Sequence, residues 1–305
     1  MAINTLEYAK VFMAALDAQI MESATTGWME ENAAQVRFTG GNEVKIPKLS
    51  MSGLGNYDRD KGFQQGSVSL SYETKKMSQD RGRTFQLDAM DVDETNFSTA
   101  AGNIMGEFQR TKVIPEIDAY RYSKIYKAAQ DGGKTTTYTP DKATILQKLL
   151  EDISAIQDTA GDGTELVISM PIPVAAILDQ AKGLERIINV GEFRQGGVSM
   201  NVRTINGIPL IRVPSLRMKT AYKFYDGVTE SQEEGGFAAA EEAKQINWII
   251  TGKRAPIAVS KTDVARIFDP ATNQTANAWK IDYRKYHDLW LLDHGVETIR
   301  ASVGA

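Results

Sequence analysis

The chain has 305 residues, which is enough for about two domains with separate hydrophobic cores. Hydrophobic residues make up 42% and charged residues 24% of the chain, as in an ordinary globular protein. No apolar run approaches the roughly 18 residues of a membrane span, and the charged N-terminal stretch is not expected to be a secretory signal. The net charge is −4, whereas proteins that grip nucleic acid backbones carry a basic surplus, so enclosure of nucleic acid is a better interpretation than tight binding.

Few residues are suited to metal or cofactor chemistry. The chain has no cysteine and only two histidines, His287 and His294, which excludes disulfides and a cysteine nucleophile and argues against structural zinc. The acidic segment Asp88–Glu94 lacks the ligand spacing of a calcium loop and is interpreted as negative charge before a helix start. We therefore expect no cofactor and no metal ion.

Two enzymatic interpretations rest on weaker patterns. The segment "AAQDGGKT", residues 128–135, has alanine where a phosphate-binding loop needs glycine, and it follows a predicted helix instead of a strand. An ATP site is therefore not expected. A pair of carboxylates for hydrolytic chemistry stays open as an alternative, because spacing in sequence does not give spacing in space.

The first part of the chain contains one helical and two extended patterns. Apolar residues at helical spacing predict an amphipathic helix over Thr5–Met21. Val44–Ser50 reads as a strand, in which Pro47 favours a sheet edge, and Ser67–Lys76 as its antiparallel partner. This hairpin is expected to present one apolar face, made of Val44, Ile46, Val68, Leu70 and Tyr72.

The segment between these strands has about fifteen residues, too many for a tight turn, and an insertion of that length is usually functional or disordered. It is rich in glycine, yet it carries Leu54, Tyr57 and Phe63 among charges of alternating sign. That mixture suits contact with the surface of another molecule. The alternative is a flexible surface hairpin that contacts nothing.

The remaining elements follow in chain order. A helix is predicted over Phe97–Gln130; its ~34 residues would span about 50 Å, with Pro115 kinking or splitting it. A second helix is expected to begin at Thr139-Pro140. Further strands are expected over Leu166–Met170 and Ile246–Thr251, on both sides of the Asn206-Gly207 turn, and twice within Trp279–Ala301.

Four segments carry a family resemblance: "VKIPKLSMSGLGNYDRDKGFQQGSVSLSYETKK", "DRGRTFQLDAMDVDETNF", "VIPEIDAYRYSKIY" and "YHDLWLLDHGVETIRAS". Their order resembles that of the major capsid proteins of tailed bacteriophages, which have the Hong Kong 97-like shell fold. The resemblance implies an α+β chain with five parts. These are an N-terminal arm (1–43), an extended β-hairpin loop (44–83), a peripheral domain with a long spine helix (84–139), an axial domain (140–245) and a second peripheral part (246–305).

In that family the extended loop lies over a neighbouring subunit. The resemblance implies a non-enzymatic major capsid protein that self-assembles into an icosahedral shell around double-stranded DNA. The expected intersubunit contacts are the loop-tip residues Leu54, Tyr57, Asp58, Arg59, Asp60, Lys61 and Phe63. The alternatives are the shell of an encapsulin-type bacterial nanocompartment and, in another class, a hydrolase with an unrecognised carboxylate site.

The resemblance also implies partners and a location. The partners are further copies in hexamers and pentamers, a portal protein, and packaged DNA held without sequence-specific binding. A separate scaffolding protein is expected because the chain begins only about forty residues before its first predicted strand. No membrane is involved, and the protein is expected in the virion after assembly in the host bacterial cytoplasm.

Overall fold

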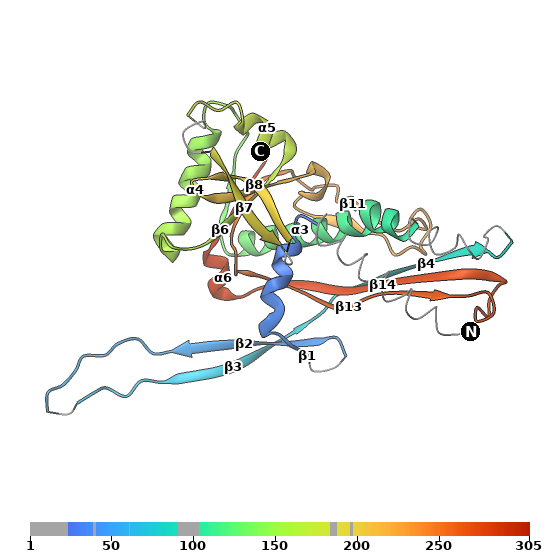
Figure 1. The fold of residues 1–305 in the computed structure, drawn as a ribbon. Helices are drawn as coiled ribbons and strands as arrows, with labels where there is room; N and C mark the ends of the chain where they lie inside the picture. Colours follow the sequence, from blue (N-terminus) through green and yellow to red (C-terminus); the bar gives the residue numbers. More distant parts are fainter. Residues whose placement is uncertain (1–23, 39–40, 61, 91–103, 184–187, 196–197) are drawn as a thin grey trace.

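The computed structural model describes the chain except for residues 1–23, 39–40, 61, 91–103, 184–187 and 196–197. The fold is α+β, as predicted. A seven-stranded sheet, a long helix, an elongated three-stranded sheet and a projecting hairpin form its main parts (Figure 1). The helix predicted over Thr5–Met21 and the start of the helix predicted from Phe97 lie outside the described residues.

The seven-stranded sheet has the order β5-β15-β12-β6-β9-β8-β7 and mixes parallel and antiparallel pairs. Its strands are β5 (Thr135–Thr137), β6 (Leu166–Pro171), β7 (Ile188–Gln195), β8 (Val198–Ile205), β9 (Ile208–Val213), β12 (Ile246–Gly252) and β15 (Ile299–Val303). The predicted turn between β8 and β9 is confirmed: Asn206 and Gly207 have φ of 51° and 80°, the left-handed values that this hairpin turn needs.

Helices bury this sheet on both faces. Helices α4 (Ile145–Ala160) and α5 (Ile172–Leu178) pack with Ile168 and Trp248 on one face, while Val167 joins the core cluster on the other. A sheet covered on both faces needs apolar residues at successive positions, which explains the nearly continuous apolar runs of β6 and β12. The helix predicted to begin at Thr139-Pro140 begins instead at Ile145, so that boundary was wrong.

The long helix continues through the position where a split was predicted. Residues 104–108 are α-helical, η2 (Gln109–Val113) is a π-helical turn, and α3 (Ile114–Asp131) follows without a gap. Pro115 cannot donate a backbone hydrogen bond, and its ring would clash with the carbonyl one turn earlier in a regular α-helix. The wider π turn directly before Pro115 relieves this clash. Of the two outcomes predicted for Pro115, the split was therefore wrong, and the kink stays a prediction.

The elongated sheet has the order β13-β14-β4, with β13 (Pro256–Phe268), β14 (Ala278–Leu291) and β4 (Gln79–Asp88) all antiparallel. Figure 1 shows it running alongside α3. Met105 and Phe108 of the long helix pack in one cluster with Ile281 and Tyr283 of β14. The short elements are η1 (Gly27–Gln35), β1 (Arg37–Phe38), η4 (Ser215–Arg217), β10 (Tyr222–Phe224), β11 (Phe237–Ala239) and α6 (Asp293–Glu297).

The sheets cross the boundaries that the sequence suggested for domains. Strand β4 extends across the boundary at residues 83/84, and β12 and β15 belong to the same sheet as β6 and β9. The two strands predicted within Trp279–Ala301 are confirmed as β14 and β15. The short helix α6 separates them, and they pair in different sheets.

A buried carboxylate fastens the N-terminal described segment to α3. Asp118 is fully buried and accepts hydrogen bonds from the backbone and hydroxyl groups of Thr25 and Thr26, at 2.6–3.1 Å. Arg217, the last residue of η4, donates a further bond at 3.0 Å. Three segments far apart in sequence therefore meet on one side chain.

We predict that Asp118→Ala lowers the free energy of unfolding by about 3–5 kcal/mol, because it strands buried donors and the Arg217 charge. Asp131→Ala removes only the exposed pair with Lys127 and should cost less than about 1 kcal/mol. Urea denaturation of the two variants checks this. Equal losses for both would contradict the role of the Asp118 cluster.

Candidate intersubunit contact site

The predicted hairpin is confirmed, with β2 (Glu43–Met51) paired to β3 (Val68–Lys76) in an antiparallel register. In this register Ile46 lies opposite Glu73, whereas Leu49 lies opposite Leu70. Residues directly opposite each other share a face, and neighbours along a strand alternate between faces. Val44 and Ile46 therefore lie on the face opposite to Val68, Leu70 and Tyr72, so the single apolar face predicted from the sequence was wrong.

The face with Val44 and Ile46 belongs to the core of the same subunit. Both side chains are fully buried at the base of the hairpin. They pack in a cluster with Met77, which directly follows β3, and with Ile257, Val259 and Trp290 of strands β13 and β14. This half of the apolar sequence pattern thus holds the hairpin to its own body.

The other face is apolar and exposed. We call it the outer hairpin face, and its members are Pro47, Leu49, Met51, Val68, Leu70 and Tyr72. Within the described part of the chain, 14 large hydrophobic side chains are exposed, and 9 of them lie between Phe38 and Tyr72. Such a concentration in 35 residues of a 305-residue chain is typical of surfaces that contact another molecule.

The tip of the hairpin has a defined shape. Asp58 and Gly62 exchange two backbone hydrogen bonds at 3.1 and 2.7 Å, and Gly62 has a φ of 79°. The rings of Tyr57 and Phe63 meet edge to face, with centroids 5.0 Å apart, and Phe63 is 90% exposed. The predicted contact residues Leu54, Tyr57, Asp58, Arg59, Asp60 and Phe63 are all solvent-accessible here, and Lys61 lies outside the described residues.

A second buried carboxylate fixes the end of the hairpin. Asp288 of β14 is fully buried and accepts bonds from the backbone and hydroxyl of Ser78 at 2.9 and 3.0 Å. Tyr120 donates to it at 2.7 Å, and Lys124 forms an ion pair with it. Because Tyr120 and Lys124 lie on α3, the long helix and the exit of the hairpin share one anchor. The sequence showed no signal for this contact.

The residues considered for metal or phosphate binding lie on several different elements of the described chain. No group of three or more histidine, aspartate or glutamate side chains within the described ranges is placed to hold a metal. His287 is buried, and burial holds its pKa well below the usual value, with Arg121 and Lys285 adding to the effect. Of the acidic segment, Asp88 bonds to the backbone of Met90, while Asp91, Asp93 and Glu94 lie outside the described residues.

The segment considered for ATP, residues 128–135, forms the end of α3 and the start of β5, which is the reverse of the strand-then-helix order of a phosphate loop. No helix in the described ranges is long and apolar enough to cross a membrane.

The fold is similar to that of shell-forming proteins at low sequence identity. A chain of the mature capsid of bacteriophage PhiM1 matches with a TM-score of 0.55 and 13% identity, over 87% of this chain and 82% of that one. The capsid protein of cyanophage P-SCSP1u gives 0.57 and 9%, over 88% and 85%. A virus-like particle from Pyrococcus furiosus gives 0.54 and 10%, over 97% and 99%. No protein-family profile and no curated protein matches the sequence.

These likenesses, together with the hairpin, the long helix and the two sheets, confirm the Hong Kong 97-like fold that the sequence predicted.

The two hairpin faces should respond differently to the same kind of change. We predict that Ile46→Ala lowers the free energy of unfolding by about 2–5 kcal/mol, because it leaves a cavity in the core. Leu70→Ala should change it by less than about 0.5 kcal/mol, because Leu70 is 62% exposed in the isolated subunit. Chemical denaturation of the unassembled subunit measures both. A destabilising Leu70→Ala would show that the outer hairpin face is not free.

Proposed function

We propose that this chain is the major capsid protein of a tailed bacteriophage, a structural protein that assembles into a closed icosahedral shell around double-stranded DNA. The outer hairpin face carries this proposal. It is a large apolar surface on a projecting element of a fold shared with capsid proteins, and its own subunit leaves it uncovered (Figure 1).

The energetics of a hairpin favour this interpretation. A two-stranded ribbon is marginally stable in water, so its exposed half needs a partner surface. Burying two or three side chains of the outer face is worth roughly 1.5–3 kcal/mol each. Identical subunits repeat such a contact around a ring, so a modest gain per copy is multiplied over a whole shell.

The remaining assignments follow from the same proposal. Within this proposal residues 1–43 act as an arm, 44–83 as the extended loop, 84–139 and 246–305 as the peripheral domain and 140–245 as the axial domain. Because β4 extends across one boundary and β12 and β15 pair across another, these boundaries divide roles and not sheets. Partners are further copies in hexamers and pentamers, a separate scaffolding protein, a portal protein and unspecifically enclosed DNA, in the virion. A net charge of −4 suits a shell whose inner surface does not adhere to its contents.

The second candidate is the shell of a nanocompartment that encloses protein cargo. This candidate is supported by the similarity of the fold to the virus-like particle from Pyrococcus furiosus, which extends over 97% of this chain. Both candidates predict closed particles of uniform diameter by electron microscopy. DNA inside purified particles would support the capsid, and enclosed protein without DNA would support the nanocompartment.

We predict that removing Leu54–Gln64 and closing the gap with a two-residue turn abolishes assembly but leaves the subunit folded. The deletion spares both strands and the buried Val44 and Ile46. The variant should stay soluble and melt cooperatively, and electron microscopy should show no shells when the scaffolding protein is present. Closed particles from this variant would contradict the role of the tip, and an unfolded variant would place the tip in its own subunit's core.

We also predict that the shell has no covalent cross-link between subunits. Such a cross-link would join a lysine of the extended loop to an asparagine of a neighbouring subunit, and the candidate asparagines are Asn247, Asn273 and Asn277. Asn247 is buried, and its amide donates to the carbonyl of Tyr138 at 2.6 Å and to the hydroxyl of Ser302. Asn273 donates its amide to the carbonyl of Ala278 at 2.8 Å. Boiled particles should therefore run as a single band near 33.6 kDa in a denaturing gel, and a ladder of multiples would contradict this.

A further inference from the structure

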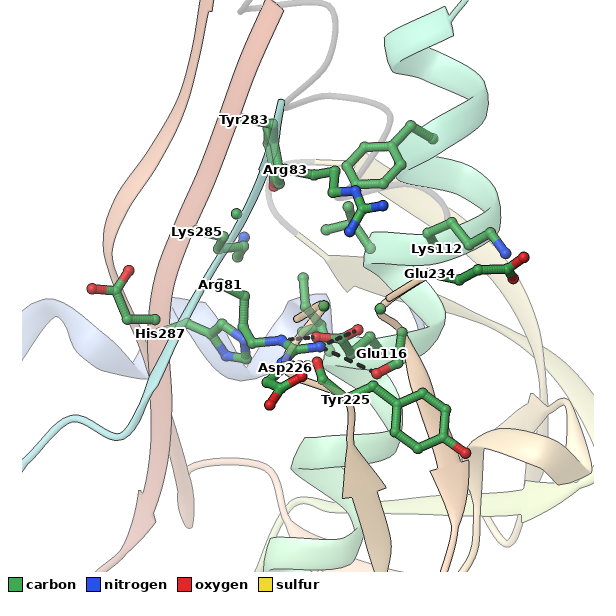
Figure 2. Close-up of a pocket in the computed structure, with 18 of the residues that line it drawn as sticks. Arg81, Arg83, Lys112, Glu116, Tyr225, Asp226, Glu234, Tyr283, Lys285 and His287 are labelled. Carbon is green, nitrogen blue, oxygen red and sulfur yellow. Dashed lines mark hydrogen bonds and ion pairs between the residues drawn. The ribbon is translucent and has the colours of Figure 1, made fainter. Parts of the chain in front are cut away.

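A cavity of about 510 Å³ lies between the long helix, strands β4 and β14, and residues 225–236 of the loop that joins β10 to β11 (Figure 2). Its volume is within the range of pockets that bind small molecules. The two buried carboxylates described above, Asp118 and Asp288, are not among the described residues that line it. The cavity is therefore a separate feature of the subunit.

Strand alternation decides which side chains of the sheet face the cavity. In the pairing of β4 with β14, Arg83 lies opposite Tyr283 and Phe85 lies opposite Ile281. Residues directly opposite each other share a face, and every second residue along a strand returns to that face. Arg81, Arg83 and Phe85 therefore lie on one face of β4, the face that lines the cavity together with Tyr283.

One wall of the cavity is aromatic. The ring of Phe108 on the long helix meets the rings of Phe85 and Tyr283 edge to face, with centroids 4.9 and 5.9 Å away. Val113, the last residue of the π-helical turn, and Ile117 on α3 also line the cavity. Such a wall suits a flat ring, because contacts between rings stabilise a complex beyond the burial of apolar area alone.

Arg81 holds the loop that forms the opposite wall. It donates to the backbone carbonyls of Tyr225 and Gly236 at 2.7 and 3.2 Å, and to the carboxylate of Glu116 on α3 at 2.7 Å. One guanidinium thus joins β4, α3 and the loop, and Glu116 neutralises its charge. The cavity is therefore formed before any ligand enters it.

Arg83 differs from the other charged side chains of the lining. Three of these belong to ion pairs, which are Asp80–Arg284, Arg81–Glu116 and Lys285–Asp263. Figure 2 shows Lys112 and Glu234 side by side, and it shows Asp226 at the other end of the cavity from Arg83. Arg83 donates to the carbonyl of Glu233 at 3.0 Å but forms no ion pair within the described residues. Its guanidinium therefore has donors and a positive charge left for a ligand.

A buried nitrogen also lines the cavity. His287 is 3% exposed, and its Nδ1 has no hydrogen-bond partner within the described residues. Figure 2 shows the side chain next to Arg81. Burial holds the pKa of His287 well below its usual value, so the imidazole is neutral and can accept a hydrogen bond. A buried polar atom without a partner costs free energy, which a donor on a ligand would recover.

We propose that the cavity between α3, β4 and residues 225–236 binds a compact aromatic oxyanion, a flat ring system that carries one carboxylate or phosphate group. The ring packs against Phe85, Phe108 and Tyr283, and the oxyanion accepts hydrogen bonds from Arg83. A polar N–H group of the ring system donates to Nδ1 of His287. This site belongs to each subunit by itself and is independent of the proposed shell function.

Isothermal titration calorimetry of the unassembled full-length chain with indole-3-acetate tests the site. This probe combines a flat ring, one carboxylate and a ring N–H group, and a Kd on the order of 100 μM is expected for a ligand of its size. Indole-3-ethanol lacks the charge and acetate lacks the ring, so each should bind at least about tenfold more weakly. Naphthalene-1-acetate lacks the N–H group and should bind about threefold more weakly.

A second titration distinguishes the two kinds of oxyanion. Thymidine 5′-monophosphate also carries a flat ring and a ring N–H group, but its anionic group is a phosphate. Tighter binding of this nucleotide would support the proposal with a nucleotide as the ligand, and tighter binding of indole-3-acetate would support it with an aromatic carboxylate. No saturable binding of either probe would overturn the proposal.

Matched variants test the role of Arg83. Arg83→Gln should weaken the binding of indole-3-acetate about tenfold, because charge-assisted hydrogen bonds become neutral ones. Arg266→Gln removes the same charge from an exposed position on β13 that does not line the cavity, and it should bind like the wild type. Equal affinities of Arg83→Gln and the wild type would overturn the site.

Hydrogen–deuterium exchange of the wild-type chain locates the ligand without any variant. Bound indole-3-acetate should slow amide exchange in residues 225–236 and leave exchange in the hairpin, residues 43–76, unchanged. Protection confined to the hairpin would overturn the assignment of the cavity. None of these outcomes bears on the shell proposal, which is tested by the formation of particles.

Discussion

The pairing register of β2 with β3 is the constraint on which the rest of the structure depends. It places Val44 and Ile46 in the subunit core and turns Leu49, Met51, Val68 and Leu70 away from it. A shift of one residue would exchange these two sets between the faces of the hairpin. The hairpin is therefore packed into its own subunit at the base, whereas its outer half is left exposed by that subunit.

Two buried carboxylates near the base of the hairpin set the direction in which it projects from the body of the subunit. Asp288 joins Ser78, at the exit of the hairpin, to Tyr120 and Lys124 on α3. Asp118 holds the segment at Thr25 and Thr26 to the same helix, one turn earlier. A buried carboxylate with several donors has few alternative geometries, so the hairpin leaves the body in a fixed direction. Repeated contacts between identical subunits require such a direction.

The sequence predicted the elements better than the contacts between them. The alternation of apolar and polar residues and the Asn206-Gly207 turn were sufficient to predict strands, because each of these signals is contained within a few consecutive residues. The face assignment of the hairpin failed because its long tip leaves the register of Val44 and Ile46 against the second strand unspecified. The π turn before Pro115 was also missed, since proline alone does not say how a helix will accommodate it. The contact between residues 225–236 and β4 could not be predicted, because these two segments are far apart in sequence and come together only in the folded chain.

The central claim, that a second copy covers the outer hairpin face, is tested most directly by methionine oxidation with peptide mass spectrometry. Met51 lies on that face and is 66% exposed in the single subunit, whereas Met77 at the hairpin base is 4% exposed and serves as the internal control. The account predicts rapid oxidation of Met51 in unassembled subunits and strong protection in assembled particles, with Met77 protected in both. Equal oxidation of Met51 before and after assembly would contradict it.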